Sequence, residues 1–265
     1  MEAIIKKDYQ VRCPQRTEVP LSEAVQEIDR RLASDPKNAD LWMERGLALA
    51  GQRLMREAVE AYSKAISIDP FQGIYYRHRA HRHLSCWEFQ EACADFTLAS
   101  RLIPDNWDVW YHLGLSHYLL GEYAEAVPAY RRCMEITETD GQMIALCDWY
   151  WRTLMRLDRR DEAEKVLEHI HESMDYIEGE LGYYYGCLIY KGLKKPEECL
   201  ERSRNYKLDA AIMAYSLSNY YRVTGSVERA DELLAELLNQ DDTEIWSYFG
   251  YLAAVADGLM GRKNI

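Results

Sequence analysis

The chain has 265 residues, of which 48% are hydrophobic and 29% charged, a composition typical of a folded protein with a sizeable core. Its 32 Lys and Arg against 44 Asp and Glu give a formal net charge of −12. That balance argues against nucleic-acid binding, which needs a basic face.

Residues 1–20 are predicted to be irregular, because Cys13-Pro14 makes a poor helix. The segment also lacks the apolar stretch of a secretory signal, and the chain has no apolar run long enough to span a membrane. The seven cysteines have irregular spacing, which favours reduced thiols over a disulfide framework. We therefore expect a cytoplasmic protein with no membrane contact.

Small, aromatic and proline residues recur along the chain at intervals of 34 residues. The recurring positions are alanine at 24, 58, 92 and 126, proline at 36, 70 and 104, and an aromatic residue at 42, 76 and 110. A fixed period of this length predicts stacked helical hairpins rather than one closed globule.

The segment 39–70 illustrates the repeating plan. Residues 41–50 place apolar side chains on one helical face, and residues 51–53 mark a turn. A second helix is predicted over 55–68 and ends before Pro70, because proline cannot continue it. The segments 73–104 and 107–138 repeat this plan.

The pattern weakens toward the C-terminus. Three further repeats are predicted near 144–175, 179–207 and 211–242, followed by a C-terminal helix over 243–260. An insertion of three residues falls near 137–141, and Pro128 is expected to kink the helix that contains it. We predict one continuous domain over residues 21–260.

These residues resemble the tetratricopeptide repeat. The match is strongest over 39–138, and its positions in the first copy are Trp42, Gly46, Leu49, Ala58, Tyr62, Ala65 and Pro70. The resemblance implies an all-α fold, a right-handed superhelical solenoid of antiparallel helix pairs. About six repeats and a half repeat at each end are expected.

The resemblance also implies a concave groove lined by the first helix of each repeat. Side chains carried over to that groove are Arg77, His78, His81, Tyr111, His112, Tyr118, Asp148, Arg152, Tyr184, Tyr215, Asn219 and Arg222. Tyrosine and arginine are frequent anchors of protein interfaces. A related clamp for chaperone C-terminal carboxylates needs Lys and Asn where this chain has Met43 and Leu47, so that function is disfavoured.

The histidines of the groove have more than one interpretation. His78 and His81 are three residues apart on one helix, and a metal shared with His112 is one hypothesis. No carboxylate or cysteine completes a ligand set, so we predict neither a metal nor a cofactor. A role in the groove is favoured over a solvated helix face.

Motifs for catalysis are missing from the sequence. It contains no phosphate-binding loop, no G-x-S-x-G and no H-E-x-x-H. We therefore predict a non-catalytic scaffold that binds an extended peptide or a helix of another protein. Two alternatives stay open: a regulatory or substrate-recruiting subunit of an enzyme complex, and an assembly protein that acts through its C-terminal helix.

The C-terminal helix is apolar on more than one face. One face is expected to pack on the sixth repeat, and the other, with Leu252, Val255 and Leu259, lacks the second helix that would cover it. Association into a homodimer is favoured over a simple cap or a site for another protein.

Overall fold

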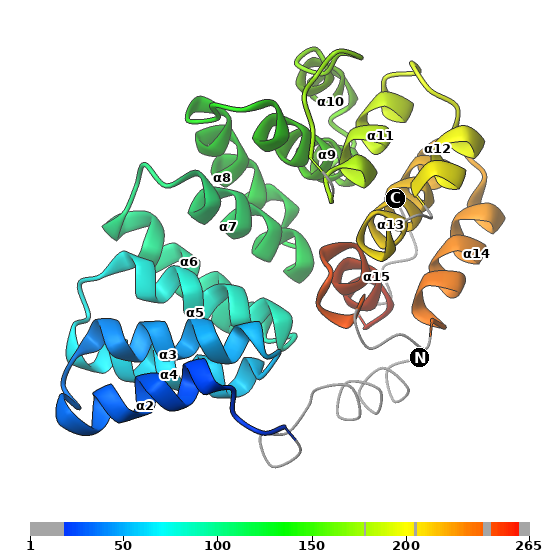
Figure 1. Ribbon diagram of the computed structural model, residues 1–265. Helices are drawn as coiled ribbons and strands as arrows, with labels where there is room; N and C mark the ends of the chain where they lie inside the picture. Colours follow the sequence, from blue (N-terminus) through cyan, green and yellow to red (C-terminus); the bar gives the residue numbers. More distant parts are fainter. Residues whose placement is uncertain (1–18, 178, 204–205, 241–244, 260–265) are drawn as a thin grey trace. The chain divides into compact units, whose positions relative to one another are not determined.

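The computed structural model in Figure 1 describes residues 19–177, 179–203, 206–240 and 245–259. These residues form 14 α-helices and one short 3-10 helix, and they contain no strand. Their packing divides them into two compact units: an N-terminal unit that ends at Ser116 and a C-terminal unit that begins at His117. The predicted all-α fold is confirmed.

The N-terminal unit consists of helices joined by short turns. They are α2 (Glu23–Ser34), α3 (Ala39–Gly51), α4 (Met55–Ile68), α5 (Gly73–Ser85), α6 (Phe89–Leu102) and α7 (Trp107–Leu120), the last of which passes into the C-terminal unit. Within this unit α3 packs against α4 and α5 against α6. The helix predicted over residues 55–68 is present with those bounds.

Close approach of α3 and α4 depends on Gly46. A Cβ atom built there would lie 2.4 Å from Cε1 of Tyr62, which is itself only 1% exposed. Tyr62 belongs to a core cluster with Val25, Leu49 and Leu54. A side chain larger than that of glycine would therefore overpack this contact.

The turn between the two helices of a pair has the same backbone conformation in successive repeats. Arg53 (φ 64°), Trp87 (φ 62°) and Gly121 (φ 76°) are left-handed and stand 34 residues apart. Glycine adopts this conformation without a Cβ clash, whereas the arginine and the tryptophan adopt it against their preference. Each of these residues directly precedes the N-cap residue of the second helix of its pair.

Tryptophan and proline positions of the repeat are joined by a hydrogen bond. Trp42 Nε1 donates to the Pro36 carbonyl at 3.0 Å, and Trp110 Nε1 donates to the Pro104 carbonyl at 2.7 Å. Both bonds tie the start of one repeat to the end of the preceding one. They explain why the two residue types share the 34-residue register.

The C-terminal unit continues the alternation of helices. Its elements are α8 (Tyr123–Glu135), α9 (Asp140–Arg156), α10 (Arg160–Leu167), α11 (Leu181–Tyr190), α12 (Pro196–Ser203), α13 (Lys207–Val223), α14 (Val227–Leu238), η2 (Ile245–Ser247) and α15 (Phe249–Leu259). Within this unit α9 packs with α8, α10 and α11, and α13 packs with α11, α12, α14 and α15.

The inserted residues near 137–141 lengthen a helix. Thr139 caps α9 through a reciprocal capping box with Gln142, so the helix begins at Asp140 rather than near residue 144. As a result α9 has 17 residues, as does α13, whereas α11 between them has only 10. This difference in length shapes the centre of the unit.

Two further expectations concern Pro128 and the chain ends. Pro128 lies inside α8, which continues on both sides of it. The C-terminal helix starts later than predicted, at Phe249, and Trp246 lies in the preceding 3-10 turn. The expectation of an irregular N-terminus falls mostly outside the described residues. None of the helices in the described ranges is both long and apolar enough to cross a membrane.

Candidate functional site

Polar side chains connect the first helices of the N-terminal unit to one another. Tyr75 on α5 donates its hydroxyl hydrogen to Oδ1 of Asp40 at 2.6 Å. Arg77, also on α5, donates from Nε to Oδ2 of Asp108 on α7 at 2.5 Å. The predicted groove residues of α5 thus lie between an acid on α3 and an acid on α7.

The imidazoles of α5 lie close to other rings of the N-terminal unit. The His78 ring lies 5.6 Å from that of Tyr62, and the His81 ring lies 4.7 Å from that of His112. Burial, followed by the nearby positive charge of Arg77 and Arg82, lowers the pKa of His78 to about 4. Burial and Arg82 also lower the pKa of His81 well below its ordinary value. Both rings are therefore neutral at pH 7.

Two residues predicted to line the groove are buried. Tyr111 stacks on Trp107 with ring centres 4.7 Å apart, and His112 stacks on Phe96 at 5.4 Å. His112 Nδ1 also lies 2.8 Å from the Asp108 carbonyl oxygen. The expectation that these two side chains form an open surface is corrected, because packing between successive helices covers them.

Asp108 is the acidic centre of this surface. Burial alone would raise the pKa of its carboxyl, but His112 and Arg77 overcome this and hold the pKa well below the usual range. Asp108 is consequently ionised and its charge is shared between two partners. Arg77 is thereby largely neutralised.

Beside these residues lie two apolar side chains of α3 and an arginine of α5 that the sequence analysis did not include in the groove. Leu47 on α3 is 43% exposed and Met43 is half-buried. Arg82 on α5, which sequence reasoning missed, contacts His81 and the sulfur of Met55. Its position next to His81, in a helix rich in arginine and histidine, is a sequence signal that could have identified it.

In the C-terminal unit the predicted groove positions other than Arg222 are buried. The residues concerned are Tyr118, Asp148, Arg152, Tyr184, Tyr215 and Asn219. Arg152 forms an ion pair with Asp148, and its Nη2 donates to Ser216 Oγ on α13 at 2.8 Å. The expectation that they face an open groove is corrected, since α9 and α13 touch directly.

The short helix α11 explains this closure. Because α11 is shorter than α9 and α13, the last turn of α9 reaches α13 beyond its end. Arg156 Nη2 donates to Asn219 Oδ1 at 3.2 Å and to Asp257 Oδ2 at 2.8 Å. Tyr215 also donates to Asp257 Oδ2 at 2.8 Å. Helix α15 therefore completes the polar centre of the unit.

Sequence reasoning missed Arg156 and Asp257. Arg156 follows Arg152 by four residues and so shares its helix face, which was a readable signal. Asp257 is an acidic residue in an otherwise apolar stretch, and a buried charge generally has a partner. The identity of that partner could not be read from the sequence, because Arg156 lies 101 residues away.

Other predicted positions have partners within the unit. The Tyr184 hydroxyl donates to the His171 carbonyl at 2.8 Å. Arg222 forms an ion pair with Asp231 on α14. These contacts join neighbouring elements of the array.

The C-terminal helix differs from its expectation. Leu252 and Val255 are 0% exposed, and α15 packs on α13 and α14. A Cβ at Gly250 would lie 2.6 Å from the Ala211 carbonyl oxygen, which shows how close α15 approaches α13. The uncovered apolar face is thus not present at Leu252 and Val255, and the side chain of Leu259 lies outside the described part.

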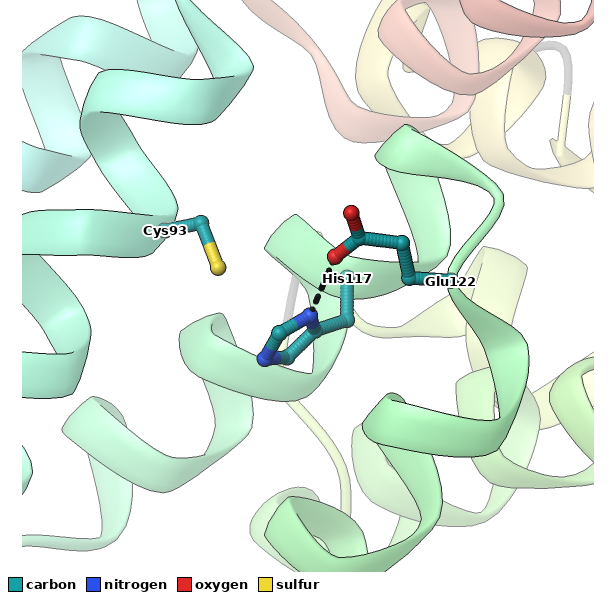
Figure 2. Close-up of side chains that lie close together, drawn as sticks. All are labelled: Cys93, His117 and Glu122. Atoms are coloured by element: carbon teal, nitrogen blue, oxygen red, sulfur yellow. Dashed lines mark hydrogen bonds and ion pairs between the residues drawn. The ribbon is translucent and has the colours of Figure 1, made fainter.

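Histidine and glutamate form a repeated pair at the turn between helices. Figure 2 shows His117 and Glu122, whose Nδ1 and Oε2 atoms lie 2.8 Å apart. One repeat earlier, His83 and Glu88 make the same contact at 2.7 Å. Each glutamate is the N-cap of the following helix, so both pairs brace the turn.

Comparison with known proteins agrees with the helical register. Tetratricopeptide-repeat family models match residues 21–73 and 107–140. The chain contains tetratricopeptide repeats. The solved structure of the MamA protein superposes with a TM-score of 0.52 at 20% identity, covering 78% of this chain and 90% of that one.

Two curated relatives match part of the sequence. The small glutamine-rich tetratricopeptide repeat-containing protein 2 of Saccharomyces cerevisiae is 32% identical over 49% of this chain and 37% of its own length. The heat-shock protein cognate co-chaperone sgt12 of Aspergillus fumigatus is 28% identical over 41% of this chain and 32% of its own length. The match thus spans about a third of each relative.

Proposed function

We propose that this tetratricopeptide-repeat protein is a non-catalytic scaffold whose N-terminal unit binds an extended segment of a partner protein. The proposed surface comprises Leu47, Met43, Arg77, His78 and His81, with Arg82 beside them. The observation that carries the proposal is the exposed Leu47 on α3, a helix that contacts α5 with its half-buried polar residues. His112 supports this surface through the contact of its ring with that of His81, and Tyr111 in turn contacts His112.

The physical support is preorganisation. The contacts of Tyr75 with Asp40 and of Arg77 with Asp108 hold the first helices in register before any partner arrives. Binding then requires little ordering of the scaffold, which favours affinity. An apolar patch flanked by cationic and imidazole groups suits a peptide with both apolar and polar side chains.

The C-terminal unit has a different proposed role. Its groove positions are already filled by contacts among α9, α13 and α15, so partner binding there would require α15 to move. Self-association through Leu252, Val255 and Leu259 would likewise require α15 to move. We therefore assign the partner-binding function to the N-terminal unit.

The relatives favour a protein as the partner. The Aspergillus relative is named a heat-shock protein cognate co-chaperone. By that similarity we propose a protein partner rather than nucleic acid, in agreement with the net charge of −12. A location in the cytoplasm would be compatible with such a partner.

Selection from a random peptide display library with the full chain tests the proposal. Peptides selected by the wild type should lose at least tenfold in affinity for the Leu47→Glu variant. Leu98→Glu is the matched control, because Leu98 lies on α6, a second helix, and is 49% exposed. Equal binding by wild type and Leu47→Glu would reject this surface.

A further inference from the structure

A cavity of about 520 Å³ lies in the C-terminal unit, between the start of α9 and the segment that joins α10 to α11. The described residues that line it include none of the predicted groove positions. Most of the lining comes from Asp140 and Gly141 in the first turn of α9 and from Asp175, Tyr176, Ile177 and Glu180 in the joining segment. This volume lies within the range of ligand-binding pockets in proteins.

Two apolar side chains that line this cavity are exposed. Tyr176 is 46% exposed and Ile177 is 70% exposed. The Tyr176 ring lies 5.1 Å from that of Tyr184, and the Ile177 amide donates to Glu180 Oε2 at 2.9 Å, so both residues are held by their own segment. Neighbouring exposed apolar side chains beside a hollow are typical of an interaction surface.

The cavity is strongly acidic. Its carboxylates belong to Asp140, Asp175 and Glu180, and the described residues that line it include no lysine or arginine. The Asp175 amide donates to Asp140 Oδ2 at 2.8 Å, and a Cβ built at Gly141 would lie 2.5 Å from Glu180 Oε1. These three acidic residues therefore approach the same turn of α9. The N-terminus of α9 offsets roughly half of one negative charge, so most of the charge of the three carboxylates remains.

The arrangement suits an extended organic cation better than a metal ion. The oxygen atoms of the three carboxylates do not all lie within 4.8 Å of one another, so they do not form a ligand set around one ion. A guanidinium is planar and has five N–H donors, so it can reach carboxylates on two elements at once. Its flat face also packs on an exposed aromatic ring such as that of Tyr176.

We propose that this acidic cavity binds an arginine side chain of a partner polypeptide, whose neighbouring apolar side chain packs on Ile177. Charge complementarity selects the arginine, and the exposed Tyr176 and Ile177 select the apolar neighbour. Residues 161–180 contain eight Asp and Glu against one Lys, which attracts a basic segment toward the cavity. The site belongs to the C-terminal unit and is additional to the surface proposed on the N-terminal unit.

The test is a titration of the isotope-labelled full chain with acetylated and amidated tripeptides, followed through the amide resonances of Gly141, Asp175 and Ile177. The probe is leucine–arginine–leucine, and the matched control is leucine–citrulline–leucine, in which an uncharged urea group replaces the guanidinium. We expect saturable shifts with the arginine peptide and at least tenfold weaker binding of the citrulline peptide at the same ionic strength. Equal binding of the two peptides, or saturable shifts with calcium chloride alone and none with the arginine peptide, would overturn the proposal.

Substitutions locate the response. The double variant Asp175→Asn/Glu180→Gln should weaken binding of the arginine peptide at least tenfold, and Ile177→Ser should weaken it by a smaller factor. Each amide keeps the size of the acid and an acceptor oxygen, which favours folding of the variant. The matched control is Glu164→Gln/Glu228→Gln, which removes the same charge from exposed positions on α10 and α14 and should leave binding unchanged.

The single variant Asp175→Asn, at an exposed position, replaces the double variant if that one fails to fold. Unchanged affinity in the folded cavity variant rejects the site. An equal loss of affinity in the control variant also rejects it, because the effect would then come from the net charge of the chain.

Discussion

The hydroxyl groups of Tyr118 and Tyr215 lie 2.8 Å apart although 97 residues separate them in the sequence. Burial raises the pKa of Tyr118 to about 12 and that of Tyr215 well above its ordinary value, so both groups keep their protons. Tyr215 donates to Asp257, and its oxygen can accept from Tyr118. The hydrogen bonds thus run from α7 through α13 to α15.

This network predicts that Asp257→Asn destabilises the C-terminal unit. Arg156 and Asp257 are almost fully buried, and loss of the carboxylate charge leaves the guanidinium without its counter-ion. We expect a loss of about 3 kcal/mol in unfolding free energy, measured by urea denaturation. Amide exchange in α15 should accelerate as well.

Asp158→Asn is the matched control for that change. Asp158 also pairs with an arginine, Arg160, but the side chains of Asp158 and Arg160 are 82% and 56% exposed. Its substitution should change stability by about 0.5 kcal/mol or less. Equal effects of the two substitutions would contradict a structural role for the buried pair.

Gly46→Ala is predicted to destabilise the N-terminal unit. The added Cβ would lie 2.4 Å from the ring of Tyr62, which is buried and has little room to move. Overpacking of this kind costs about 1–3 kcal/mol, measurable as a lower denaturation midpoint. Gly51→Ala is the control, because a Cβ there meets no atom within 4 Å.

Arg79→Met should destabilise the chain more than Arg82→Met does. Arg79 makes two hydrogen bonds to Asp95, both 2.7 Å long, and Asp95 is buried. Without Arg79 the buried Asp95 carboxylate loses its guanidinium partner, which should lower the unfolding free energy by about 3 kcal/mol. Arg82→Met removes a cation that has no carboxylate partner in the described part of the chain, so the unfolding free energy should fall little or rise. The opposite ranking in urea denaturation would count against this charge assignment.

Stability is predicted to decrease as the pH falls from about 6.5 to about 4. His78 has a folded-state pKa of about 4, below the ordinary value of 6.5, so the unfolded chain takes up a proton first. The contribution is complete above pH 6.5 and lost as the pH approaches 4. After allowance for partial exposure, it amounts to about 1–2 kcal/mol.

The variant His78→Gln isolates this contribution. Its unfolding free energy should depend less on pH over the same interval than that of the wild type, as measured by urea denaturation at successive pH values. His169→Gln is the control, since His169 is exposed. If His78→Gln retains the full dependence on pH, another group is responsible.

Much of the N-terminal unit was predictable because its determinants are local. The spacing of Gly46, Tyr62 and Pro70 encodes helix pairing, and helix bounds such as 55–68 follow from turn and stop signals close in sequence. The positions of Arg77, His78 and His81 on one first helix were also readable. The contacts of Arg82 with Met55 and His81 were not readable, because they depend on how the neighbouring helices pack.

The sequence by itself determined the all-α repeat architecture, because a 34-residue register is a one-dimensional signal that each repeat carries independently. Only the tertiary structure decided which predicted groove residues remain accessible. The length of α11 lets Arg156 reach Asn219 and Asp257, and this contact buries Arg152, Tyr215 and their neighbours. Such burial depends on contacts between elements up to 101 residues apart, for which no local pattern exists.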